Sequence, residues 1–146
     1  MVKKEIEIII RDFADALEKK DAERALSFFI DDATWFNVEG TFKGKEQIKR
    51  YITWMFKSSS DMKFKDDGIG IILQGNKAVY QNICEFTYEG KKIIMNIIDI
   101  FEFIEGKCIT HWTMSDRLST AKQAVAGPIA RMAVSKISTQ MQKGLN

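Results

Sequence analysis

The chain has 146 residues, of which 45% are hydrophobic and 29% are charged, with nine glycines and one proline. This composition excludes collagen-like and disordered chains, and a chain of this length can bury a core and enclose a pocket within one globular domain. Twenty-two basic residues against twenty acidic ones give a formal net charge of +2, which is too small to predict a nucleic-acid partner.

Cysteine and histidine are scarce. Two cysteines and one histidine are too few for a disulfide framework or for a structural zinc site. The first residues intersperse acidic with apolar side chains, unlike a secretory signal, and no apolar run reaches the ~18 residues that span a bilayer. We therefore expect a cytoplasmic protein with reduced thiols, no metal or other cofactor, and no membrane partner.

The first half of the chain has the pattern of helices around one strand. Apolar residues at intervals of three and four predict a helix over residues 3–19, and Asp21 is a suitable N-cap for a second, short helix. Residues 33–39 are rich in β-branched and aromatic side chains, as is typical of a strand. Helical spacing returns at Gly44 and ends in the Ser/Asp cluster of residues 58–61.

The second half has the pattern of an antiparallel meander. Residues 62–118 are strand-like and are divided by three hairpin signals, at Gly75-Asn76, Glu89-Gly90 and Glu105-Gly106. Helices that precede a run of strands favour an α+β fold, with the helices segregated to one side of the sheet.

The last segment differs in charge from the rest. No acidic residue follows Asp116, while five basic residues do, so the total of +2 divides into +5 for the tail and −3 for residues 1–116. Residues 119–146 are helical by composition, with an interruption at Gly127-Pro128, where proline suits the first turn of a new helix.

Three segments, together with the order of the elements, resemble a known superfamily. They are Phe29-Ile-Asp-Asp-Ala-Thr-Trp-Phe-Asn37, Thr87-Tyr-Glu-Gly-Lys-Lys92 and Ile98-Asp-Ile-Phe-Glu-Phe103. The chain resembles the nuclear transport factor 2-like superfamily over about residues 5–118, and ketosteroid isomerase and the SnoaL-like polyketide cyclases in particular. The resemblance implies a cone-shaped, strongly bent antiparallel or mixed sheet wrapped around the N-terminal helices, with a deep apolar pocket. It also implies a SnoaL-like domain over residues 1–118 and a basic helical extension over residues 119–146.

Alternation along residues 97–103 separates two faces of a strand. Asp99 and Phe101 share one face, which by the resemblance looks into the cone. The opposite face carries Ile98 and is expected to continue through Trp112 and Met114 of the next strand. An apolar outer face of this size is suited to a two-fold homodimer.

Asp99 and His111 are the candidate catalytic residues. Apolar neighbours disfavour a charged carboxylate, so Asp99 can stay protonated as a hydrogen-bond donor near pH 7. Ketosteroid isomerase carries an aspartic acid at the matching position, in its oxyanion hole. If His111 lies beside Asp99, we expect the two side chains to share one proton across neutral pH. A three-residue loop over residues 104–106 would place Asp99 directly opposite His111, with Cβ atoms ~5 Å apart. A two-residue loop would break this pairing. The alternatives are a solvated aspartate that points outward and a histidine that only fills the sheet.

Two positions depart from the ketosteroid isomerase pattern. Asn37 stands where that enzyme carries its general base, and Phe13 stands where it carries a tyrosine donor. An amide cannot take up the proton and a phenyl ring cannot donate one, so we do not expect steroid isomerisation by that mechanism. Thr113 stands where SnoaL-like cyclases commonly carry an acidic residue, which puts cyclisation by their mechanism in doubt too.

An apolar cavity with a few convergent polar groups is what a small-molecule site needs, although aromatic residues would also serve only to fill the cone. The ligand-binding residues expected from the sequence are Trp35, Asn37, Tyr51, Trp54, Tyr80, Asn82, Phe86, Phe101 and Thr113. We expect a small apolar organic ligand and acid–base chemistry of isomerase, dehydratase, hydrolase or cyclase type. The alternative is a non-catalytic ligand-binding or dimerisation domain.

The tail offers an apolar stripe of Ile129, Ala133, Ile137 and Met141 at helical spacing. We expect this stripe to pack on the acidic body or on a second subunit. A lid over the pocket and an external partner are the alternatives.

Overall fold

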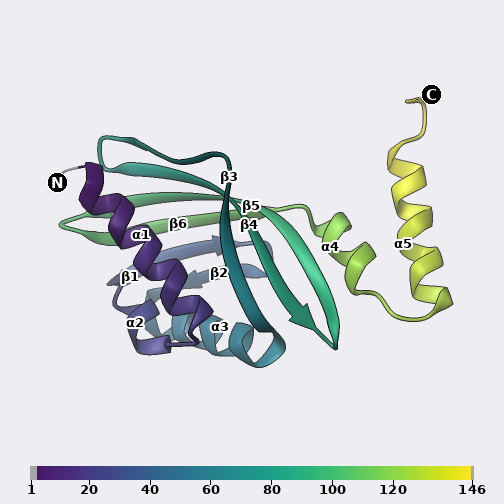
Figure 1. The fold of residues 1–146 in the computed structure, drawn as a ribbon, viewed down its shortest axis with the longest axis horizontal. Coiled ribbons are helices and arrows are strands. Elements are labelled where there is room, and N and C mark those ends of the chain that lie inside the picture. The colour runs from purple at the N-terminus through teal and green to yellow at the C-terminus, as the bar shows by residue number, and fades with distance from the viewer. Residues whose placement is uncertain (1–2, 146) are drawn as a thin grey trace.

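The structure, a computed structural model, describes residues 3–145 and has an α+β architecture. Figure 1 shows a bent sheet with the N-terminal helices gathered on one face and the C-terminal helices beyond its end. In chain order the elements are α1 (Lys3–Glu18), α2 (Ala22–Leu26), β1 (Phe29–Asn37), β2 (Gly40–Lys43), α3 (Gly44–Ser58), β3 (Ser60–Gln74), β4 (Lys77–Tyr88), β5 (Lys91–Ile104), β6 (Lys107–Ser115), α4 (Arg117–Ala124) and α5 (Pro128–Met141).

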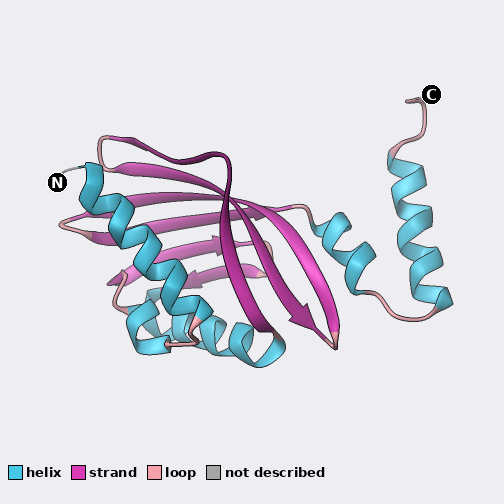
Figure 2. Cartoon of the chain, in the orientation of Figure 1, coloured by secondary structure: helices cyan, strands magenta, loops and turns pink. Residues whose placement is uncertain are grey.

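The sheet has the strand order β2-β1-β6-β5-β4-β3. Only β1 and β6 run parallel, while every other neighbouring pair is antiparallel. The long strands β3, β4 and β5 twist away from β1 and β2, and α1, α2 and α3 lie against the concave face (Figure 2). The predicted cone-shaped α+β fold is confirmed.

The core forms where α1 meets the concave face of the sheet. The buried side of α1 presents Ile6, Ile10, Phe13 and Leu17, the residues whose spacing predicted the helix. Phe13 stacks on Phe28 with ring centroids 4.2 Å apart. Burial of each large side chain stabilises the fold by ~1.5–3 kcal/mol, so this apolar stripe holds α1 in the cone.

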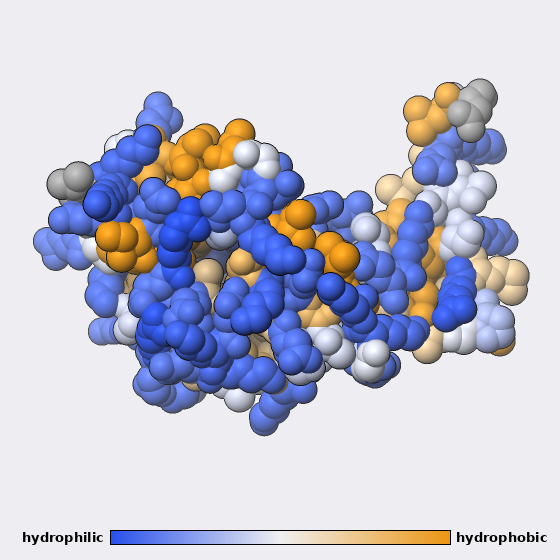
Figure 3. Space-filling model, viewed as in Figure 1, coloured by the Kyte–Doolittle hydropathy of each residue, from blue (hydrophilic) through white to orange (hydrophobic). Residues whose placement is uncertain are grey.

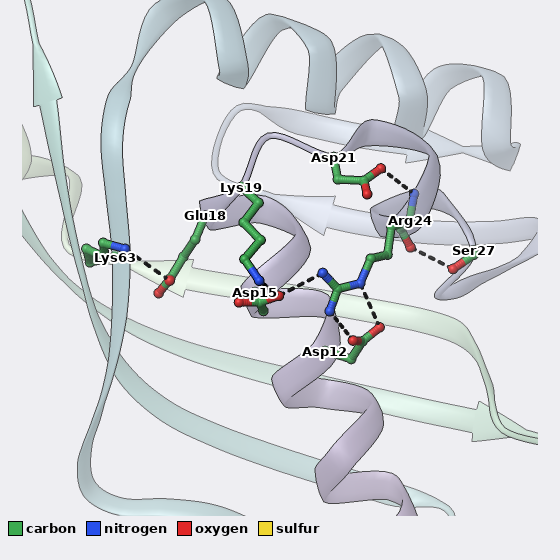
Figure 4. A network of polar contacts seen from close by, with 8 residues as sticks. All are labelled: Asp12, Asp15, Glu18, Lys19, Asp21, Arg24, Ser27 and Lys63. Atoms are coloured by element: carbon green, nitrogen blue, oxygen red, sulfur yellow. Dashed lines mark hydrogen bonds and ion pairs between the residues drawn. The ribbon is translucent and has the colours of Figure 1, made fainter.

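Ionic contacts join α1 to its neighbours on the outside of the cone (Figure 4). Arg24 of α2 pairs with Asp12 and Asp15 of α1, the latter at 2.7 Å. Glu18, at the end of α1, pairs with Lys63 of β3 at 3.5 Å. Because exposed pairs contribute only ~0–1 kcal/mol each, they orient the helices more than they stabilise them.

The first strand was only partly predicted. β1 begins at Phe29, four residues before the expected start. The prediction began too late because Asp31 and Asp32 were interpreted as a break between the preceding helix and the strand. Both acids are exposed, and the register with β6 shifts between Phe29 and Thr34, so they lie in an irregular part of the strand that faces water. The short strand β2, which pairs with β1, was not predicted.

The β5–β6 hairpin corrects the predicted register. Its loop consists of two residues, Glu105 and Gly106, both with positive φ, and not of three. This loop alone would place Asp99 opposite Trp112. An irregularity between Glu102 and Phe103 shifts the register by one further residue, so Asp99 pairs with Thr113, and the predicted direct pairing of Asp99 with His111 is wrong. A shift of one residue exchanges the two faces of a strand. The loop alone would turn His111 away from the face of Asp99, and the bulge returns it to that face, as the sequence predicted.

The two helices of the tail behave differently. α4 is attached to β5, because the Gln123 side chain donates to the Ile94 carbonyl and accepts from the Ile94 amide, both at 2.8 Å. α5 stands away from the sheet, and its Ile129 and Met141 are 78% and 72% exposed. Figure 3 shows this helix as a separate column with hydrophobic surface. The expected packing of the α5 stripe on the body of its own chain is therefore wrong.

None of the described helices is long and apolar enough to cross a membrane.

Candidate functional site

A cavity of about 450 Å³ lies between the concave face of the sheet and helices α1, α3 and α4. Its volume is within the range of small-molecule sites, ~300–1,000 Å³. The predicted residues that line it are Trp35, Asn37, Tyr51, Trp54, Tyr80, Phe86, Asp99, Phe101, His111 and Thr113. Asn82 does not line the cavity; it is fully buried and contacts Asp99 from the adjacent strand. The structure thus brings all but one of the predicted residues to a single cavity.

Asp99 is the centre of the polar contacts in this cavity. Its Oδ1 atom accepts from Thr113 Oγ1 at 2.7 Å and lies 2.8 Å from His111 Nε2. Its Oδ2 atom accepts from Asn82 Nδ2 at 2.9 Å. The carboxylate is only 8% exposed, and what remains accessible faces the cavity. Three side chains from β4 and β6 therefore fix one carboxylate of β5 at the cavity wall.

The direction of the Thr113 hydroxyl follows from its neighbours. Trp35 Nε1 lies 2.9 Å from Thr113 Oγ1, and because an indole nitrogen can only donate, the threonine oxygen must accept from it. The threonine proton is then free to point to Asp99 Oδ1. This gives a directed chain of hydrogen bonds from Trp35 through Thr113 to Asp99.

His111 lies behind Asp99, enclosed by aromatic rings. Its ring stacks on Trp35 at 4.5 Å and packs on Phe101 at 4.3 Å, and it is 1% exposed. Burial lowers the pKa of His111, although its contact with Asp99 opposes the shift. His111 Nδ1 has no partner, and an unpaired lone pair is tolerated better than an unpaired N–H. The neutral tautomer with its proton on Nε2, donated to Asp99, is therefore favoured.

Asp99 is the acceptor in each of these contacts. Thr113, Asn82 and the Nε2-protonated His111 all direct hydrogens at its oxygens. A carboxyl group that only accepts hydrogen bonds is in its ionised form, whereas the sequence led us to expect a protonated donor.

Tyr80 differs from its expected role. Its hydroxyl donates to Asp66 Oδ1 at 2.9 Å, and Asp66 in turn receives two hydrogen bonds from Arg11, each at 2.9 Å. The guanidinium holds the pKa of Asp66 below its usual range, whereas burial and Asp66 raise the pKa of Tyr80. Tyr80 therefore contributes its ring to the cavity, and its hydroxyl is already occupied.

The open end of the cavity is formed by α3, α4 and the end of β1. Trp54 is 52% exposed there, and Asn37 is half-buried. Arg117 donates to the Val38 carbonyl at 2.9 Å and lies 3.6 Å from Glu39. This end is polar, while the walls below it are aromatic and aliphatic.

Besides residues of the sheet such as Met62 and Phe64, sequence reasoning missed two groups of lining residues on helices. One is the inner side of α1, with Ile10, Ala14 and Leu17, whose helical spacing was recognised but interpreted only as core. The other is α4, with Thr120 and Ala121, which was placed in the tail. Its short, weakly amphipathic sequence carries no signal that it reaches the cavity.

Neither cysteine lies in surroundings that lower the pKa of its thiol. Cys84 lines the cavity, and burial raises the pKa of its thiol to about 12, while Cys108 is fully buried. Both agree with the prediction of inert packing. Among residues 3–145, no cluster of three or more histidine, cysteine or acidic side chains could hold a metal ion.

The fold and the position of the cavity define the class of protein. Several solved structures share the architecture at low identity. An epoxide hydrolase from Mycobacterium tuberculosis is 14% identical with a TM-score of 0.72, over 92% of this chain and 97% of that one. The polyketide cyclase IdmH from Streptomyces antibioticus, described as putative, is 16% identical with a TM-score of 0.69, over 81% and 96%. A Catenulispora acidiphila protein with a ketosteroid isomerase-like fold, solved with trimethylamine, is 13% identical with a TM-score of 0.73, over 80% and 91%.

These likenesses establish a nuclear transport factor 2-like, ketosteroid isomerase-like fold and nothing of activity. The sequence itself matches the SnoaL-like domain over residues 10–123, and the chain belongs to that family. A search of curated proteins gives no significant match. The suspected superfamily is thus confirmed, and the match extends through most of α4.

Proposed function

We propose that the cavity binds a small, largely apolar organic molecule and that Asp99 acts on it as a general base. The observation that carries this proposal is the Asp99 carboxylate, held at the cavity wall by Thr113, His111 and Asn82 with its accessible edge toward the ligand. A base must be within hydrogen-bond reach of the proton that it removes, and a partly desolvated carboxylate is well suited to this task.

In this scheme His111 is a positioning residue. Its ring packs on Trp35 and Phe101, and its Nε2 atom contacts Asp99, so its role is to orient that carboxylate. The reaction class is acid–base chemistry of isomerase, dehydratase, hydrolase or cyclase type. Solved structures of similar fold are named as an epoxide hydrolase and, in the putative case of IdmH, as a polyketide cyclase. They support this range of reactions but do not favour one reaction over another.

Binding is tested with 2-naphthol, which combines an apolar body with one hydroxyl donor. We expect one molecule per chain by isothermal titration calorimetry. Ala14→Trp, which fills the cavity from α1, should abolish binding, whereas Ala133→Trp on the exposed face of α5 should leave it unchanged. Equal binding of 2-naphthol by the two variants would show that it binds outside this cavity.

Proton transfer is tested with 2-tetralone, a neutral ketone with acidic C–H bonds. In deuterated buffer the wild type should speed deuterium uptake next to the carbonyl, as followed by NMR. Asp99→Asn should reduce the rate by ~10²–10⁴-fold, the usual contribution of a positioned base. Uptake at the same rate in both proteins would refute the role of Asp99 as a base.

The second candidate function is ligand binding without chemistry. It is favoured by Asn37 and Phe13, which replace the base and a donor of ketosteroid isomerase. It predicts that the wild type binds 2-naphthol. It also predicts that 2-tetralone takes up deuterium no faster with the wild type than with Asp99→Asn.

We further propose that the protein is a cytoplasmic homodimer formed through the convex face of the sheet. On that face Ile98, Trp112 and Met114 are 44%, 37% and 49% exposed, and Phe36 stacks on Trp112 at 5.2 Å. Contiguous apolar surface of this kind is typical of an interface. The cytoplasmic location rests on two buried, unpaired cysteines, which suit a reducing compartment.

A further inference from the structure

The negative charge of Asp99 has no cationic partner. Its hydrogen-bond donors are a hydroxyl, an amide and an imidazole, and among the described residues its only potential ion pair is with His111. Burial lowers the pKa of that imidazole, so it stays neutral. Asp99 therefore places a net negative charge at the wall of a largely apolar cavity.

The other titratable groups near Asp99 do not offset this charge. Asp99 acts electrostatically on Tyr51, Tyr80 and Cys84, and burial raises the pKa of all three. They are therefore neutral at physiological pH. Among the described residues that line the cavity, the one arginine or lysine is Arg117, which already contacts Val38 and Glu39 at the open end. A buried charge without a counter-charge is costly, and a ligand that supplies one relieves this cost on binding.

The walls of the cavity also suit a cation. Trp35 and Tyr51 pack edge to face at 5.1 Å, and Tyr51 stacks on Trp54 at 5.8 Å. Phe86 and Phe101 line the same cavity on the sheet side. Aromatic faces attract organic cations, and more strongly where water is excluded. An acidic group at one point of an aromatic enclosure is complementary to a protonated amine with an apolar body.

We infer that the ligand of this cavity is an organic cation, a protonated amine on an apolar body, whose ammonium group donates to Asp99 while the aromatic walls enclose the rest. This inference rests on the proposed binding function and names its ligand class. It does not depend on the proposed chemistry.

The test compares two probes of nearly the same shape, 2-phenylethylammonium and 2-phenylethanol. Isothermal titration calorimetry with the full chain should give at least ~10-fold tighter binding for the ammonium probe. Asp99→Asn removes the charge but keeps the side-chain shape. It should abolish the preference while binding of the alcohol stays within about twofold, since neutral contacts with the walls persist.

The structure suggests that Asp99→Asn will fold. Asn82 Oδ1 is buried without a partner, so rotation of the Asn82 amide would give the new amide an acceptor. Glu39→Gln is the matched control, because Glu39 is an exposed acid that also lines the cavity. It should retain the preference for the ammonium probe.

Each outcome is decisive. Equal or tighter binding of 2-phenylethanol by the wild type would overturn the inference and leave the proposed binding of apolar molecules intact. If the preference for the ammonium probe survives in Asp99→Asn but disappears in Glu39→Gln, the ammonium group binds at the open end of the cavity. That result would also overturn the inference. Failure of both probes and of 2-naphthol to bind would overturn the proposed binding function itself.

Discussion

Thr113 links two buried groups, and its loss should destabilise the fold. In Thr113→Val the Trp35 N–H loses its acceptor and Asp99 loses one donor. An unsatisfied buried polar group costs ~1–3 kcal/mol, so the free energy of unfolding in urea should fall by about that amount. Thr110→Val, on the convex face of the same strand, should change it by less than ~0.5 kcal/mol. Equal effects of the two substitutions would contradict the hydrogen-bond chain.

His111 should make stability depend on pH in a defined window. Because burial lowers its pKa in the folded state from the ordinary 6.5, the unfolded chain binds a proton that the folded chain does not. Stability should therefore decrease as the pH falls below about 6.5. His111 is the only histidine, and carboxyl groups titrate mainly below this window, so His111→Gln should flatten the curve between about pH 7 and 5. A wild-type curve without slope there would contradict a buried neutral imidazole.

At the scale of single residues, the sequence predicted which side chains meet, but it did not predict the strand register that brings them together. Asp99 and His111 do meet on the concave face, but through a diagonal arrangement in which Thr113 is opposite Asp99. The two-residue loop and the bulge near Glu102 together produce this register. A single sequence shows hairpin signals but not bulges, because the extra residue is set by packing on both faces of the sheet.

Among the elements, α4 and α5 should contribute very differently to stability. A chain that ends at Gly127 lacks α5 and should melt close to the wild type, because the exposed side chains of α5 bury little surface. A chain that ends at Asp116 lacks α4 as well and should melt lower, because it loses the hydrogen bonds of Gln123 with Ile94. Differential scanning calorimetry measures both. An equal decrease for the two truncations would show that α5 is the packed element.

Strongly periodic elements were predicted well. The helices α1 and α3 and the three hairpins are local features, set by apolar spacing and by turn residues. The short strand β2 and the early start of β1 depend on pairing with distant strands, which no local pattern reveals. The division of the chain near residue 118 stays a prediction, although α4 lines the cavity together with the helices of the body.

For the whole molecule, the convex face should decide the oligomeric state. Ile100→Glu places a charge at the centre of that face and should give monomers, or insoluble protein, because an unpaired charge is costly to bury. Ile129→Glu on α5, where the side chain is 78% exposed, should not change the state of the body. Sedimentation velocity at micromolar concentration measures both, and a monomeric wild type would refute the dimer.

Carbon NMR of the Asp99 carboxyl group tests most directly whether Asp99 is an ionised acceptor in a ligand cavity. With ¹³C-labelled aspartate, the Asp99 resonance is the one that Asp99→Asn removes. We predict the chemical shift of an ionised carboxylate at about pH 7, and a change in that shift when 2-tetralone is added. The change should be absent in Ala14→Trp. A protonated Asp99 at this pH, or a resonance that 2-tetralone leaves unmoved, would contradict the account.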